Sequence, residues 1–138
     1  MKSKYMITIM FLAFVGQVFS QDGPADKQYM LIVRSKVHPN LKSGMVQTNI
    51  EHWQQFISGL IKSGQLVTGY KPSEDGATIA GKKKKVGATT FMSDSEEISS
   101  VFIIKAASLG IAKEIALKCP VYELDGSVEI REVKASMK

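Results

Sequence analysis

Two histidines are the first residues to consider for acid–base or metal chemistry. His38 precedes Pro39 in a polar stretch, and His52 stands beside Trp53 in a segment with helical periodicity. The histidines are fourteen residues apart, and no His-x-x-x-His pair or carboxylate at ligand spacing accompanies them. The sequence therefore predicts no metal site. It leaves His52, at the edge of an apolar stripe, as a candidate general acid or base.

Glu129 and Arg131 are a second pair of residues that could take part in catalysis or ligand binding. They are two residues apart in a predicted strand, so their side chains share one face. Either they form part of a solvated sheet edge, or they line a cavity and bind a polar ligand. In the second case Glu129 is another candidate acid–base residue, and Arg131 would orient an anionic group. Trp53 and Phe91 would supply the apolar walls of such a ligand site.

Cys119 is the only cysteine, so no internal disulfide can form. It ends the second predicted helix on its apolar side, where a thiol is usually a small buried hydrophobe. The negative end of the helix dipole also disfavours a thiolate there. A nucleophilic role for Cys119 is therefore not expected.

Four consecutive lysines, residues 82–85, lie in a predicted turn between Gly81 and Gly87. They are either a solvated turn or a site for an anionic partner. No aromatic residue is interleaved with them, as stacking on nucleic-acid bases would require. We therefore expect no nucleic-acid partner.

The first twenty residues have the pattern of a cleavable signal peptide. Two lysines precede an apolar stretch over residues 5–15, and Val18 and Ser20 fit the −3 and −1 positions of a cleavage site. Such a stretch rises only ~1.5 Å per residue as a helix, too little to cross a hydrocarbon core of ~30 Å. The sequence predicts a mature N-terminus at Gln21, a secreted or periplasmic location and no membrane association after cleavage.

The predicted mature chain of 118 residues is long enough for one domain with one core. Removal of the leader lowers the formal charge from +5 to +3. Residues 21–27 are predicted to be a flexible N-terminus, residues 28–133 an α+β domain and residues 134–138 a polar tail.

Hydrophobic periodicity predicts two helices, over residues 45–63 and 109–118. Gly64 is expected to end the first helix, Ser108 to cap the second and Pro120 to stop it. Strands are predicted over residues 28–34, 65–71, 101–105 and 127–133, with one or two more within 77–92. Residues 93–100 and 121–126 are predicted to be a turn and a loop.

This order reduces to βαββαβ, the ferredoxin-like arrangement, with both helices on one face of the sheet. The strands carry more apolar positions than a half-exposed sheet tolerates. A second subunit's sheet would cover the other face, so we expect a homodimer.

The stretch from Ala116 to Val133 resembles the closing signature of YCII-related proteins of the DGPF type. The matching residues are Cys119, Pro120, Gly126, Ser127, Val128, Glu129 and Arg131. The segments around Tyr29–Leu31, residues 52–69 and residues 101–120 are also similar to that family. The resemblance covers residues 28–133 and implies a dimeric α/β barrel of ferredoxin-like subunits.

The chain departs from the family pattern at its chemical positions. The Asp-Gly-Pro-Phe motif falls on residues 88–91, where only Phe91 is kept. The family's proposed active His falls on Trp53, one residue from His52, and its Asp falls on Cys119. The resemblance therefore implies the fold more than an activity.

Three classes of function remain open. The first is a domain that binds a small anionic or aromatic molecule, and the second is a cofactor-independent lyase or isomerase acting on a small organic acid. The third is an interaction protein of the cell envelope. No cofactor is expected in any of the three.

Overall fold

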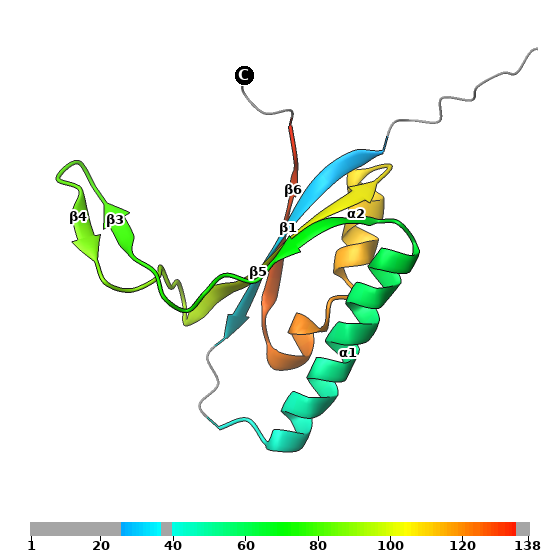
Figure 1. The fold of residues 1–138 in the computed structure, drawn as a ribbon, viewed down its shortest axis with the longest axis horizontal. Coiled ribbons are helices and arrows are strands. Elements are labelled where there is room, and N and C mark those ends of the chain that lie inside the picture. Colours follow the sequence, from blue (N-terminus) through cyan, green and yellow to red (C-terminus); the bar gives the residue numbers. More distant parts are fainter. Residues whose placement is uncertain (1–25, 37–39, 135–138) are drawn as a thin grey trace, which may run out of the picture.

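The computed structural model describes residues 26–36 and 40–134 (Figure 1). The predicted signal peptide, His38 and the C-terminal residues 135–138 lie outside this part of the chain. No helix within the described ranges combines the length and apolar character that a membrane span requires.

A four-stranded antiparallel sheet forms the centre of the domain. Its strands are β1 (Lys27–Lys36), β2 (Leu66–Tyr70), β5 (Glu96–Ala106) and β6 (Ser127–Glu132), in the order β2-β5-β1-β6. This order, with a helix after β1 and another after β5, confirms the predicted ferredoxin-like α+β fold.

A layer of helices covers one face of this sheet (Figure 1). It consists of α1 (Ser43–Lys62), α2 (Leu109–Ala116) and a short 3-10 helix, η1 (Pro120–Leu124). Gly64 after the first helix and Ser108 before the second lie where the sequence predicted them. Gly64 follows α1 with a φ of 68°, a left-handed conformation that glycine adopts without steric cost, and the Ser108 hydroxyl accepts a hydrogen bond from the Ile111 amide at 3.3 Å.

The core lies between the sheet and the helices. Alternate residues of the central strands point into it, including Leu31 and Val33 of β1 and Phe102 and Ile104 of β5. Gly69 of β2 faces the Phe102 ring. A Cβ at this position would lie 2.8 Å from that ring, so only glycine leaves room for it.

Two predictions about the C-terminal half were wrong. Residues 93–100 were predicted to be a turn, but β5 already begins at Glu96 and pairs there with Lys36 of β1. Cross-strand backbone pairing therefore extends the strand through polar residues. The second helix ends at Ala116 rather than Lys118, and η1 replaces part of the predicted loop because Pro120, at its first position, has the φ that begins a helical turn.

Residues 71–95, here called the arm, project from the body between β2 and β5 (Figure 1). The arm contains a small hairpin of β3 (Thr78–Ala80) and β4 (Lys85–Gly87), which pair only with each other. The lysine run lies at its tip, where it forms the predicted turn.

Candidate functional site

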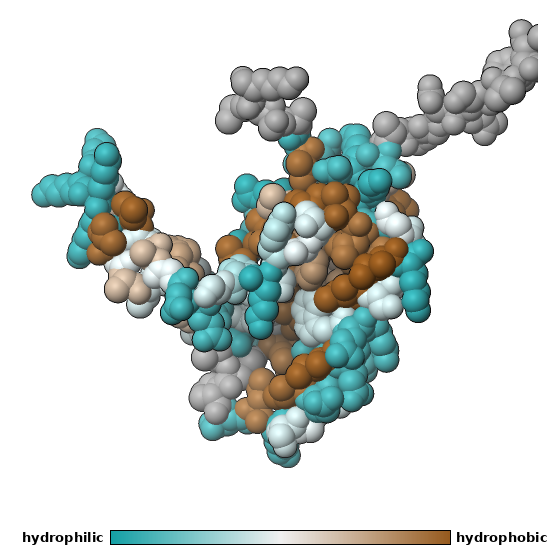
Figure 2. Space-filling view, viewed as in Figure 1, coloured by the Kyte–Doolittle hydropathy of each residue, from teal (hydrophilic) through white to brown (hydrophobic). Residues whose placement is uncertain are grey.

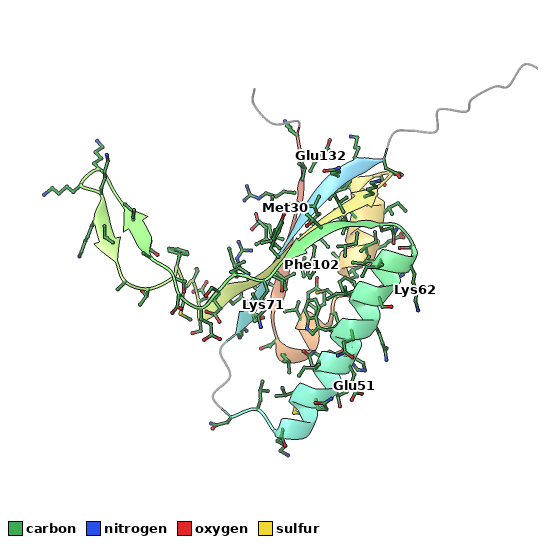
Figure 3. All side chains as sticks on the ribbon, viewed as in Figure 1. Met30, Glu51, Lys62, Lys71, Phe102 and Glu132 are labelled. Carbon is green, nitrogen blue, oxygen red and sulfur yellow. The ribbon has the colours of Figure 1, made fainter. Side chains whose placement is uncertain are left out.

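No described helix covers the second face of the main sheet, here called the open face. Its apolar centre consists of Met30 and Ile32 on β1 with Val101 and Ile103 on β5, which pair as cross-strand neighbours. Figure 3 shows Met30 and Phe102 pointing to opposite sides of the sheet. Strand alternation therefore separates this apolar strip from the core.

A cluster of three charged residues borders the apolar strip. Arg34 Nη2 donates to Glu129 Oε2 at 2.8 Å, and Arg131 Nε donates to Glu129 Oε1 at 2.5 Å. Both hydrogen bonds lower the pKa of Glu129, and the bond from Arg131 has the larger effect. The cluster contains two guanidinium groups and one carboxylate, so it keeps one positive charge in surplus.

Glu129 and Arg131 thus share a face, as their spacing predicted, and they pair with each other. Sequence reasoning missed Arg34. Its even spacing from Met30 and Ile32 on β1 was the available signal, since residues at i, i+2 and i+4 of a strand line one face.

The three predicted ligand-binding residues do not lie in one place. Trp53 packs between α1 and the sheet, stacked on Phe102 with ring centroids 6.1 Å apart and edge-on to Phe56 at 5.9 Å. Arg131 lies on the open face, on the other side of the sheet. Phe91 lies on the arm, with 75% of its surface exposed.

Phe91 lines a cavity of about 910 Å³ where the arm meets the sheet. Arg34 and Ser99 of the main sheet line it from the other side. Its charged lining is mostly acidic, with the two basic residues Arg34 and Lys71 against four carboxylates, those of Glu74, Asp94, Glu96 and Glu97. This lining disfavours an anion inside the cavity itself.

A separate groove of about 580 Å³ runs between α1 and the segment formed by α2 and η1. Its apolar lining comes from Phe56, Leu60, Ile115 and Pro120. At one end His52 Nδ1 lies 2.7 Å from Glu123 Oε1. The groove therefore combines an apolar wall with a histidine–carboxylate pair.

Asn49 holds the carboxylate of this pair in position. Its side-chain amide donates to Glu123 Oε2 at 2.9 Å and to the Pro120 carbonyl oxygen at 2.9 Å. The Asn49 hydrogen bond is the main cause of a lowered Glu123 pKa, and the bond with His52 adds to it. An ionised Glu123 orients the imidazole, an arrangement suited to general acid–base chemistry at Nε2.

Sequence reasoning identified His52 but missed both of its neighbours. Glu123 is 71 residues from His52, and η1 carries no pattern that predicts a partner for α1. Asn49 is buried in the structure, but its place in the sequence pattern is that of an ordinary polar residue of the helix.

Cys119 is buried in the core, and burial raises its pKa to about 11. The thiol is therefore protonated at neutral pH, which agrees with the predicted structural role. In the described part of the chain, no group of three or more His, Cys, Asp or Glu side chains is placed to hold a metal ion.

Comparison with known proteins identifies the family. No curated protein matches the chain significantly. A model of the YCII-related domain matches residues 30–136, which include β1 from Met30 onward, the other three strands of the main sheet, both helices and the open-face cluster. The chain therefore belongs to the YCII-related domain family.

Proposed function

We propose that this domain binds a small anionic organic molecule on its open face. The observation that carries the proposal is the positive surplus of the Arg34–Glu129–Arg131 cluster beside an apolar strip. A carboxylate attached to an aromatic or aliphatic body complements both features. Its charge would meet Arg131, and its body would lie on Ile32 and its neighbours.

The two arginines have different parts in this proposal. The Arg34 side chain is 30% exposed and holds Glu129, whereas the Arg131 side chain is 69% exposed on the same carboxylate. Arg131 can therefore turn toward a ligand while Arg34 continues to neutralise Glu129. A guanidinium group binds a carboxylate through two parallel hydrogen bonds, which fixes the ligand's orientation.

A second copy of the chain would complete the site. The apolar strip of the open face would otherwise stay in water, and antiparallel sheets with two apolar faces normally pack on a second layer. Two open faces packed together would enclose the ligand. They would also shield the ion pair between its carboxylate and Arg131 from water. The proposed functional unit is therefore a homodimer.

A thermal-shift series with small aromatic and aliphatic carboxylates tests the ligand proposal. A carboxylate at about 100 times its Kd stabilises a protein by about 2.7 kcal/mol, an easily measured rise in Tm. Arg131→Ala should abolish the rise, whereas Lys62→Ala on the far side of the domain should keep it. Equal rises in Arg131→Ala and wild type would reject the proposal.

The homodimer is tested by light scattering of the wild type and of Ile103→Asp. An aspartate at the centre of the open face should dissociate the dimer because its charge would be buried at the interface. Thr68→Asp, at the edge of the same face, is the milder comparison. A wild-type mass of one subunit at micromolar concentration would contradict the homodimer.

We also propose that the domain is exported after cleavage before Gln21, on the sequence pattern described above. N-terminal sequencing of protein recovered from the medium or the periplasm measures the cleavage point. A chain that keeps its first twenty residues in a membrane fraction would contradict it.

The His52–Glu123 pair favours a second candidate function, proton transfer by a cofactor-independent enzyme on a small organic acid. The 2.7 Å contact and its support from Asn49 provide an oriented base beside an apolar groove. His52→Ala should then abolish turnover while the open-face carboxylate still raises Tm. Turnover that survives His52→Ala would remove this candidate.

A further inference from the structure

The arm carries apolar side chains that its own hairpin cannot bury. Ile79 and Val86 face each other across the hairpin and are 67% and 66% exposed, and Phe91 and Met92 near its base are 75% and 48% exposed. Figure 2 shows brown, hydrophobic surface on an arm that stands clear of the body. A two-stranded hairpin of this size has little stability of its own, so its apolar residues indicate a partner surface.

Charge along the arm and its base is separated rather than mixed. Lys82–Lys85 form the tip, and five carboxylates surround the base, those of Glu74, Asp75, Asp94, Glu96 and Glu97. With Lys71, the segment from 71 to 97 has five lysines and five carboxylates, so its formal charge is zero. Among described residues, no salt bridge engages the tip lysines or these carboxylates.

This pattern identifies the kind of partner. A polyanion or an anionic lipid surface would be attracted by the tip but repelled by the carboxylates at the base. A second arm that runs in the opposite direction matches both ends at once, because its tip meets the base and its base meets the tip. A two-fold axis produces this self-complementary contact.

We infer that the arms of two copies of this chain pair in opposite directions across the dimer axis, with the lysine tip of each arm against the acidic base of the other. The inference rests on the homodimer proposed above and adds a contact to it. The arm leaves the sheet away from the helical layer, on the side where a second copy would pack (Figure 1). Ile79, Val86 and Phe91 are then buried between the two arms.

The test uses two charge-reversed full-length chains. The tip variant carries Lys82→Glu, Lys83→Glu and Lys85→Glu, and the base variant carries Glu74→Lys, Asp75→Lys and Asp94→Lys. All six positions are exposed, so the variants should fold, which circular dichroism verifies. The matched control variant carries Lys62→Glu on α1, Lys113→Glu on α2 and Lys118→Glu just after α2.

Sedimentation velocity measures the dimer dissociation constant of each chain. Each reversed variant alone places like charges together, so its Kd should rise at least about tenfold, and the control should change little. A mixture of the tip and base variants pairs opposite charges at both contacts. It should form a heterodimer with a Kd within about threefold of wild type, weakened by added salt.

The possible failures are distinguishable. If wild type and both reversed variants dimerise equally while Ile103→Asp does not, the homodimer stands and the arm pairing is wrong. Weakened variants whose mixture does not recover would also overturn the pairing of tip with base. A monomeric wild type would overturn both proposals.

Discussion

Asn49→Ala is a direct test of how the helical layer is held together. Asn49 lies on α1 with 7% of its surface exposed and donates to two acceptors of η1. The substitution removes both donors and leaves the Pro120 carbonyl oxygen buried without this hydrogen bond. It also removes the group that holds Glu123 beside His52.

The expected loss of unfolding free energy follows from these two hydrogen bonds. The bond to the carbonyl oxygen contributes about 1 kcal/mol, and the bond to the carboxylate about 1.5 kcal/mol, because Glu123 is partly exposed and regains water. Alanine returns about 0.5 kcal/mol through its higher helix propensity. The expected net loss of unfolding free energy is about 2 kcal/mol, a fall in Tm of about 8 °C for a domain of this size.

Urea denaturation followed by circular dichroism measures this loss, with Gln54→Ala as the control on an exposed position of the same helix. The control should change stability by less than about 0.5 kcal/mol. A second readout is the pKa of Glu123, which should rise toward its ordinary value in Asn49→Ala. If Asn49→Ala loses no more stability than Gln54→Ala, the hydrogen bonds to η1 do not hold the helical layer as argued.

Three other changes have definite expected outcomes. Gly126→Ala should destabilise the domain by about 3 kcal/mol in urea denaturation, because a Cβ there would lie 2.5 Å from the Arg34 carbonyl oxygen; an unchanged midpoint would contradict this. The Glu123 pKa is lowered in the folded state, so its contribution to stability is present above about pH 4.5 and is lost as pH falls through the lower folded-state pKa. The difference in unfolding free energy between wild type and Glu123→Gln should therefore shrink from about pH 7 to about pH 3, and a constant difference would reject this coupling. Cys119, with a pKa of about 11, should react with a thiol reagent at about pH 8 at least about 100-fold more slowly in the folded than in the denatured chain, whereas equal rates would mean that the thiol is accessible.

Local signals in the sequence were enough for most of the secondary structure. The apolar spacing of α1, the glycine after it and the serine before α2 act within a few residues, so they can be read without the rest of the chain. The start of β5 could not be read in this way. Residues 96–100 are mostly polar and become a strand because β1 offers them backbone partners.

The candidate sites show the same difference between local sequence signals and contacts that form only in the tertiary structure. Glu129 and Arg131 share a face because strand geometry repeats every two residues, and the sequence alone determines that relation. Arg34 reaches Glu129 only because β1 and β6, 95 residues apart at this contact, are neighbours in the sheet. Glu123 meets His52 only because η1 folds back onto α1, a contact between segments 71 residues apart that no local pattern encodes.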